Sequence, residues 1–346
     1  MSALKAAVIG CGRIGSTIDD EIDRWSSHML PYSHAARYAE APQTQLVAGC
    51  DADPEKAETF RQRWGTAEAF CDIHEMMRAA QPDIVSIATQ TATRVEAALA
   101  AIEHNPRALF IDKPVAENLA DTDRLMGACR ERGIVVAVNC SRVWGPRAIQ
   151  ARELLQEGII GDLRSVTAFC GGGLSHMGSH IITFMTFYAG PVSWVVGQTA
   201  PAPEGQPDRD VGGRVLLQFE GGAHGYLNML DAGPVGVELD LVGTKGRIRA
   251  LNNCAEWELW LPGTLPAKNN YLARQQFPMP HQMTAWGLRS VQDLCECVQT
   301  GRKPLCDLQD GRHALEIALA ARRSSQGGSV RVDLPYDDAH DTIQSA

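Results

Sequence analysis

The segment from Ala6 to Gly15 constrains the fold more strongly than any other part of this sequence. An apolar run, Ala6 to Ile9, leads directly into the pattern G-x-G-x-x-G, formed by Gly10, Gly12 and Gly15. After a strand, the first glycine permits a tight turn, the second lets the backbone approach a pyrophosphate, and the third allows close packing of the next segment. Backbone N–H groups at the start of a following helix then face the phosphates. On its own, the pattern also fits a purely structural turn.

A second apolar run, Leu46 to Cys50, ends at an acid, Asp51. An acid at the end of the second strand accepts hydrogen bonds from ribose hydroxyls, and its charge repels a 2′-phosphate. The two segments together predict a dinucleotide site and favour NAD over NADP. The alternative for Asp51 is a role in a turn or helix cap before Pro54. Asp51 follows Gly15 by 36 positions, whereas the usual separation is about 20.

Length and composition limit the remaining possibilities. A chain of 346 residues is too long for one ordinary core and predicts two domains. A net charge of −9 argues against a general nucleic-acid or anionic-membrane surface, and no apolar run approaches the roughly 18 residues of a membrane span. The apolar N-terminal run predicts a strand and not a secretory signal. Ten scattered cysteines without a C-x-x-C pair indicate reduced thiols, mostly in the core, of a cytoplasmic protein.

The first 140 residues alternate short apolar runs with helical patterns, which is typical of a doubly wound parallel sheet. The expected strands are Ala6–Gly10, Leu46–Cys50, Ile84–Ala88, Ala108–Ile111 and Ile134–Asn139. The expected helices are Pro54–Trp64, Ile73–Ala80, Val95–Glu103 and Leu119–Arg132. We therefore predict that residues 1–140 form a dinucleotide-binding Rossmann domain.

Strand patterns dominate after about residue 150, with one face of several strands polar. The expected strands are Leu163–Cys170, Arg214–Phe219, His224–Leu230, Val237–Val242, Arg247–Leu251 and Trp257–Leu261. Gly221-Gly222 predicts a hairpin, and Gln198–Asp210 a loop. The expected helices are Ala148–Glu157, a stretch from about His176 to Tyr188, Met283–Val298 and Arg312–Ser324. Residues 141–346 are thus predicted to form an α+β domain with a large, open, mainly antiparallel sheet.

One tripeptide, Asp112-Lys113-Pro114, follows the Ala108–Ile111 strand. It resembles the Glu-Lys-Pro motif of the Gfo/Idh/MocA oxidoreductases, the family of glucose–fructose oxidoreductase and inositol dehydrogenase. The similarity recurs along the chain in Val8–Gly15, Ala48–Ala57, Pro82–Ala88, Asn139–Pro146, Gly158–Val166, Gly178–Gly190, Phe219–Gly225 and Gly243–Arg247. The resemblance implies NAD or NADP as cofactor, a sugar or cyclitol as substrate, and a homo-oligomer of two or four chains. It also implies that the second domain binds substrate and mediates oligomerisation.

The chain departs from the family pattern at three places. Asp112 replaces the usual glutamate, and His176 stands where the family has the aspartate of Asp-x-x-x-His. The third departure is Ser16–Ser33, an insertion of roughly 16 residues before His34-Ala35, which accounts for the long spacing to Asp51. The insertion contains three aromatic side chains, Trp25, His28 and Tyr32. We expect them to cover the cofactor or line the substrate entrance, and a buried place in a subunit interface is the alternative for Trp25.

Lys113 and His180 are the predicted catalytic residues. A lone lysine is usually a solvated charge, but Lys113 leaves an apolar strand between Asp112 and Pro114, which favours a place in a cleft. An ammonium group there steers the substrate oxygen while hydride leaves, and burial allows it to share proton transfer. His180 stands on an apolar helical pattern, where a histidine is often a core residue, and matches the family's catalytic histidine. Its ordinary pKa suits a general base.

His176 precedes His180 by one helical turn on the same face. This spacing also permits zinc, but no glutamate follows His176 as in H-E-x-x-H and no third ligand is evident. We therefore predict no metal and assign His176 a substrate-contacting or orienting role. Asn139 and Arg142, between the two domains, are further predicted substrate contacts, with linker packing as the equal alternative. Thr89, Gln90 and Thr91 follow a strand at the sheet edge, where ligands bind, although an ordinary polar loop has the same composition.

The primary hypothesis is an NAD-dependent dehydrogenase that oxidises a secondary hydroxyl of a sugar, cyclitol or related polyol. The predicted cofactor-binding residues are Gly10, Gly12, Arg13, Ile14, Gly15, Asp51, Thr89, Gln90, Asp112 and Lys113. The predicted substrate-binding residues are Lys113, Asn139, Arg142, His176 and His180. Two alternatives remain open: a redox-neutral glycosidase or lyase that oxidises its substrate transiently, and a non-catalytic nucleotide-sensing regulator. A redox-neutral enzyme would form product without accumulating NADH, which distinguishes it from a dehydrogenase. The presence of both Lys113 and His180 argues against the regulator, since a sensor needs neither.

Overall fold

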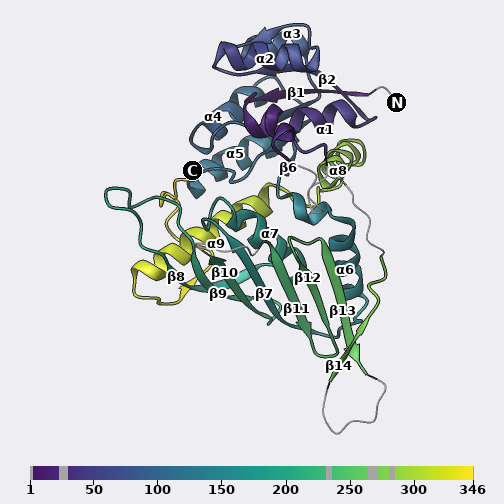
Figure 1. The fold of residues 1–346 in the computed structure, drawn as a ribbon. Helices are drawn as coiled ribbons and strands as arrows, with labels where there is room; N and C mark the ends of the chain where they lie inside the picture. Colours follow the sequence, from purple (N-terminus) through teal and green to yellow (C-terminus); the bar gives the residue numbers. More distant parts are fainter. Residues whose placement is uncertain (1–2, 23–29, 231–235, 264–270, 280–284, 346) are drawn as a thin grey trace. The chain divides into compact units, whose positions relative to one another are not determined.

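The computed structural model describes residues 3–22, 30–230, 236–263, 271–279 and 285–345, and the chain divides into two compact units (Figure 1). The first comprises Met1–Trp144 and Thr284–Arg312, and the second comprises Gly145–Met283 and His313–Ala346. The boundary expected after residue 140 left helix α8 (Trp286–Thr300) in the second domain. In the structure α8 instead packs beside β6 (Val135–Val138) and α1 (His34–Glu40) of the first unit. The sequence carries no local signal for this return of the chain.

Six parallel strands form the sheet of the first unit within the described residues, in the order β3-β2-β1-β4-β5-β6. They are β1 (Leu4–Ile9), β2 (Thr44–Cys50), β3 (Ala69–Phe70), β4 (Ile84–Ile87), β5 (Ala108–Ile111) and β6. Every residue of β4 and β5 is buried, so helices cover both faces of the sheet. The connecting helices are α2 (Pro54–Trp64), α3 (Ile73–Ala80), α4 (Thr91–Ile102) and α5 (Leu119–Arg132). The predicted Rossmann sheet is confirmed.

The chain between the glycine loop and α1 departs from an ordinary first helix. The residues described at its start form a wide π-type turn, η1 (Arg13–Thr17), and a 3₁₀ turn, η2 (Ile18–Asp20). The Asp19 carboxylate accepts the backbone N–H groups of Tyr32 at 2.7 Å and Ser33 at 3.1 Å, which closes the two ends of the insertion on one another. The predicted roles of Trp25 and His28 concern residues outside the described ranges.

The second unit contains a mixed sheet, nine-stranded in the described part of the chain, in the order β14-β13-β12-β11-β7-β10-β9-β8-β15. Among these strands only β7 and β10 run parallel, so the sheet is mainly antiparallel, as predicted. The first five strands in chain order are β7 (Leu163–Gly171), β8 (Val192–Thr199), β9 (Gly213–Phe219), β10 (His224–Leu230) and β11 (Glu238–Gly243). The others are β12 (Arg247–Leu251), β13 (Glu256–Pro262), β14 (Leu272–Gln275) and β15 (Val332–Asp333).

Helices α6 (Pro146–Gln156), α7 (Gly178–Ala189) and α9 (Leu308–Gln326) complete this part of the fold, and in Figure 1 they lie behind the sheet. α9 comes close to β8, where a Cβ on Gly197 would stand 2.1 Å from the Ala321 carbonyl oxygen. The predicted hairpin at Gly221-Gly222 is present between β9 and β10. β8, β14 and β15 were not predicted, and α7 begins two residues later than expected because the chain before it is held from outside the helix.

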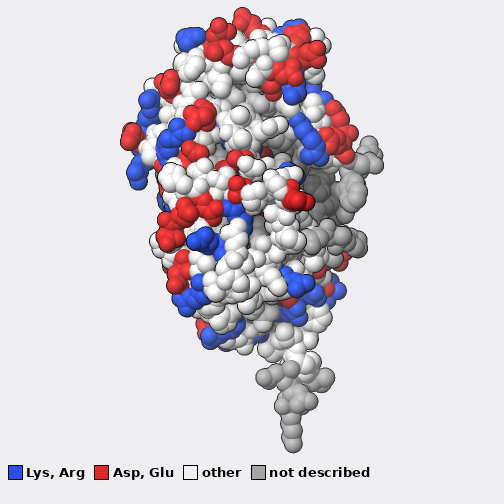
Figure 2. Space-filling view, turned by 90° about the vertical axis from the view of Figure 1, so that its left-hand side faces the viewer, with Lys and Arg blue, Asp and Glu red and all other residues white. Residues whose placement is uncertain are grey.

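The surface and the cysteines agree with the composition. On the face shown in Figure 2, acidic and basic side chains are interspersed, without a large field of one sign. All ten cysteines lie in the described ranges, none forms a disulfide, and nine are buried. Among the described residues, no helix is both long enough and apolar enough to cross a membrane.

Candidate active site

The three glycines of the loop serve different ends. Gly10 has φ +94°, and a Cβ there would lie 2.6 Å from the carbonyl carbon of Ala88, so the loop after β4 passes too close for any side chain. A Cβ on Gly15 would stand 1.9 Å from the Gly10 carbonyl oxygen. A Cβ on Gly12 would meet no atom within 4 Å. The first and third glycines are therefore required by packing, and the second leaves open the space that a pyrophosphate needs.

Asp51 lies at the end of β2 and joins that strand to the glycine loop. One carboxylate oxygen, Oδ2, accepts the backbone N–H of Cys11 at 2.8 Å, and Oδ1 accepts that of Asp53 at 3.0 Å. The cap of α2 is Asp53, which accepts the N–H of Glu55. Asp53, and not Asp51, is therefore the cap of the helix. The contact between Asp51 and the Asp53 N–H is a turn contact. Residues around Gly12 and Asp51 thus fit a dinucleotide with free ribose hydroxyls.

Arg13 and Ile14 occupy the two positions between the second and third glycines of the loop. The Arg13 guanidinium donates to Glu21 at 2.7 Å, and both side chains are about half exposed or more. Ile14 is half-buried. Arg13 is therefore engaged by the insertion that follows the loop, a contact that the sequence does not reveal.

Asp112 and Lys113 leave the end of β5 as a buried pair. Lys113 is 8% exposed, and burial lowers the pKa of its ammonium group while the Asp112 carboxylate opposes this effect. Burial alone would raise the pKa of Asp112, but Arg94 and Lys113 hold it below its ordinary value. A lysine in this setting is a partly desolvated cation at the sheet edge where ligands bind.

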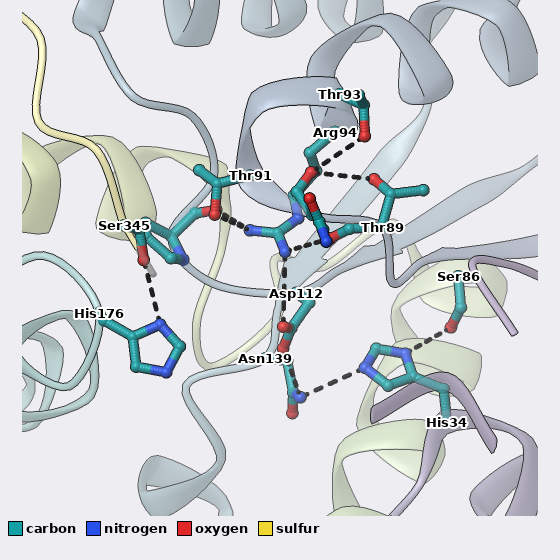
Figure 3. A network of polar contacts seen from close by, with 12 residues as sticks. His34, Ser86, Thr89, Thr91, Thr93, Arg94, Asp112, Asn139, His176 and Ser345 are labelled. Atoms are coloured by element: carbon teal, nitrogen blue, oxygen red, sulfur yellow. Dashed lines mark hydrogen bonds and ion pairs between the residues drawn. The ribbon is translucent and has the colours of Figure 1, made fainter. Parts of the chain in front are cut away.

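A buried polar network surrounds Asp112 (Figure 3). Arg94, on α4, forms an ion pair with Asp112 at 3.6 Å and donates to the carbonyl oxygens of Thr89 and Pro114. Asn139 follows β6, and its Nδ2 donates to Asp112 Oδ1 at 3.0 Å while its Oδ1 accepts from Arg37 at 2.8 Å. Arg94 therefore joins the loop that follows β4 to the loop that follows β5 and carries Lys113.

His34 extends the network from Asn139 to Ser86 on β4. Its Nδ1 lies 2.8 Å from Ser86 Oγ, and its Nε2 lies 3.3 Å from Asn139 Nδ2. Complete burial lowers the pKa of His34 to about 3, so the imidazole is neutral at physiological pH. No function is predicted from sequence for His34, Arg37 or Arg94, because the first two lie on α1 and the third on α4, and only the fold brings them together.

The remaining predicted residues of the first unit lie at the same edge of the sheet. Thr89 is half-buried, and Gln90 is exposed and precedes α4. Arg142 is buried in the 3₁₀ turn η3 (Ser141–Trp144). The Asn139 amide is committed to Asp112 and Arg37, which gives the packing alternative for Asn139 a physical basis.

In the second unit, the two predicted histidines bracket the start of α7. His180 is 8% exposed and stands in the first turn of the helix, with Ile181, Ile182 and Phe184 buried beside it. His176 precedes the helix. Its backbone N–H donates to Asp210 Oδ2 at 2.7 Å, and its Nδ1 lies 3.0 Å from Ser345 Oγ (Figure 3). Neither Asp210 nor Ser345 was predicted, since they lie 34 and 169 positions from His176.

Comparison with known proteins identifies the family of the chain. Residues 4–140 match the family model for an oxidoreductase family with an NAD-binding Rossmann fold, and residues 152–334 match the model for its C-terminal alpha/beta domain. Trans-1,2-dihydrobenzene-1,2-diol dehydrogenase of Bos taurus is 24% identical over 97% of this chain and 99% of its own. A dTDP-3,4-didehydro-2,6-dideoxy-alpha-D-glucose 3-reductase of Saccharopolyspora spinosa is 29% identical over 62% of this chain and 70% of its own.

The solved structures give the same fold. Levoglucosan dehydrogenase, in complex with NADH and L-sorbose, superposes with a TM-score of 0.82 over 97% of this chain and all of that chain, at 19% identity. The family models and the fold place the chain among oxidoreductases with an NAD-binding Rossmann domain. The chain belongs to the Gfo/Idh/MocA oxidoreductase family.

The zinc alternative for His176 and His180 gains no support. In the residues that the structure describes, no group of three or more His, Cys, Asp or Glu side chains is arranged to hold a metal ion. The Nδ1 atom of His176 instead lies at hydrogen-bond distance from a serine hydroxyl.

Proposed function

We propose that this protein transfers hydride between a secondary hydroxyl group of a sugar, cyclitol or related polyol and the nicotinamide ring of NAD. The names of its relatives support this substrate class, since one is a cyclic-diol dehydrogenase, one a sugar-nucleotide reductase and one a levoglucosan dehydrogenase. The observation that carries the proposal is Lys113, a buried lysine with a lowered pKa beside Asp112 at the end of β5.

The glycine loop and the strand ends of the first unit hold the cofactor. Gly12, where a Cβ would meet no atom within 4 Å, would admit the pyrophosphate, and Asp51 beside the loop would accept hydrogen bonds from the ribose hydroxyls. Thr89 and Gln90 contribute polar groups at the same edge. When bound, NAD supplies the hydride acceptor. Asp112, buried against Arg94, acts by keeping Lys113 in place and charged.

Lys113 and His180 divide the handling of the hydroxyl group between them. The Lys113 ammonium donates to the substrate oxygen and stabilises the negative charge that develops there. The His180 imidazole accepts the hydroxyl proton. His176 contacts the substrate and orients it. His180 takes up the hydroxyl proton, and with NAD as hydride acceptor the overall reaction would yield a ketone, NADH and one proton.

Substitution of either catalytic residue tests the proposal. Lys113→Ala and His180→Ala are each expected to lower kcat at least about 100-fold, because each removes a charge-stabilising or proton-accepting group. The NAD dissociation constant should stay within about twofold if NAD affinity rests on the glycine loop and Asp51. The measurements are NADH formation with a panel of cyclic diols, inositols and anhydrosugars, and NAD binding by calorimetry.

Exposed residues provide matched controls: Lys245→Ala and His224→Ala should leave both quantities unchanged. Near-wild-type turnover in both catalytic variants would overturn the assignment. Product that forms without net NADH would instead indicate a redox-neutral reaction.

We also propose that the protein is a cytoplasmic dimer or tetramer. Analytical ultracentrifugation of the NAD-bound protein measures the mass of the oligomer.

A further inference from the structure

The segment from Asp341 to Ser345 is tied to the loop that ends at Asp210. The backbone N–H of Gln344 donates to the Asp208 carbonyl at 2.7 Å, and the Gln344 carbonyl accepts the N–H of Asp210 at 3.0 Å. Gln344 forms a parallel bridge with Arg209, and Ile343 is 1% exposed. Asp341 is held by Arg322 on α9 and by the Tyr336 hydroxyl. The segment is therefore anchored along its length to the second unit.

Asp210 continues this connection to the chain in front of α7. Its two carboxylate oxygens accept the backbone N–H groups of Ser175 at 2.9 Å and His176 at 2.7 Å. A Cβ on Gly173 would stand 2.1 Å from the Asp210 carboxylate, so only glycine permits this close approach. The Leu174 N–H donates to the Val211 carbonyl at 3.0 Å. The loop thus fixes the backbone of the residues that precede the helix.

Ser345 makes the second contact to the same residue. Its hydroxyl oxygen lies 3.0 Å from His176 Nδ1, which is a hydrogen-bond distance in either direction of proton donation. The partner of one imidazole nitrogen decides which nitrogen carries the proton, and hence what the other nitrogen offers a ligand. His176 is consequently held at both its backbone and its ring, by residues 34 and 169 positions away.

We propose that Ser345 and Asp210 are positioning residues for His176, so that the segment 341–345 acts as a structural part of the substrate site. Asp210 fixes the backbone of His176, and Ser345 fixes its ring orientation and its tautomer. The kinetic part of this inference rests on the proposed function, because it takes His176 as a substrate contact. The tautomer itself does not depend on turnover.

The direct test is therefore spectroscopic and needs no substrate. We expect the ¹⁵N shifts of the His176 imidazole to report one dominant tautomer in the wild-type protein at neutral pH. Ser345→Ala should yield a mixture of tautomers, and Ser345→Thr, which keeps the hydroxyl, should restore the wild-type ratio. Thr342→Ala is the matched control, because it removes a hydroxyl of the same segment that donates to the His340 carbonyl. An unchanged ratio in Ser345→Ala would overturn the proposal.

The kinetic test asks whether Ser345 acts through His176. Ser345→Ala is expected to raise KM about fivefold to tenfold, the worth of one neutral hydrogen bond, with a smaller change in kcat. In a His176→Ala background the same substitution should have no further effect, whereas independent residues would be additive. Additivity would contradict the positioning role.

Asp210 has its own paired control on the same loop. Asp210→Asn leaves one acceptor oxygen for two N–H groups and should lower kcat/KM about tenfold. Asp208→Asn, at a carboxylate that faces Arg322 from 3.6 Å, should have little effect. Equal losses in both would remove Asp210 from the proposal. If the wild-type protein turns over no polyol, the proposed function fails. The imidazole spectrum still decides whether Ser345 fixes the tautomer of His176.

Discussion

The two halves of the proposed catalytic machinery are constructed differently. Lys113 leaves a strand end and is surrounded by a fully buried network, in which Arg94, Asp112 and Asn139 hold one another. His176 is half-buried and is held by Asp210 and Ser345. Charges inside a core are stable only with their partners, whereas a half-buried imidazole can lose a partner to water. Substitutions around Lys113 should therefore cost stability, and those around His176 should mainly change function.

The largest expected effect is at Arg94. Arg94→Met removes the guanidinium that neutralises Asp112 and binds the carbonyls of Thr89 and Pro114. Breaking a buried pair from one side costs about 3–5 kcal/mol, because the buried carboxylate loses its ion-pair partner. Urea denaturation should show this loss in the free energy of unfolding.

Arg124 supplies the matched control for that comparison. Its pairs with Glu96 and Asp121 lie at the surface, and its side chain is 48% exposed. Arg124→Met should cost less than about 1 kcal/mol. Equal losses of stability in the two variants would contradict the distinction between the buried network and ion pairs at the surface.

The parts of the site that the sequence predicted are those whose chemistry is local. Gly10, Gly12 and Gly15 stand within six residues, Asp51 ends an apolar run, and Lys113 lies between Asp112 and Pro114. The parallel sheet of the first unit follows from the same alternation of strands and helices. The predicted helix Leu119–Arg132 agrees to the residue, because Asn118 caps its start and Gly133 ends it.

The parts that escaped prediction depend on contacts over long stretches of chain. Arg37, His34 and Arg94 read as ordinary helical residues, and their burial is known only once α1 and α4 cover the sheet. Asp210 ends a loop rich in proline and glycine, and Ser345 belongs to no periodic pattern. Helix α8 is amphipathic, but nothing in its sequence says which domain it covers. A pattern identifies the element, and the fold decides its neighbours.

The glycine loop offers a comparison within the first unit. Gly15→Ala places a Cβ 1.9 Å from the Gly10 carbonyl oxygen and should cost about 1–3 kcal/mol of stability, as overpacking does. Gly12→Ala meets no atom within 4 Å, so its stability should be nearly unchanged. Its NAD affinity should fall at least about tenfold if the pyrophosphate occupies that space. Calorimetric NAD binding by a fully folded Gly12→Ala protein at wild-type affinity would place the cofactor elsewhere.

The effect at His34 appears only at acid pH and separates buried from exposed histidines. Its pKa is about 3 in the folded protein and about 6.5 in the unfolded chain. Between these values the unfolded chain binds the extra proton, so stability falls as the pH falls, by on the order of 1 kcal/mol per pH unit. Above pH 6.5 both states are neutral and this contribution to the slope vanishes. His34→Gln should flatten the dependence between pH 6.5 and 4, whatever its stability at pH 8. His340→Gln, at an exposed position, should retain the wild-type slope. Denaturation midpoints across this range measure both, and parallel curves for wild type and His34→Gln would mean that the imidazole is hydrated and the network around Asn139 is open to solvent.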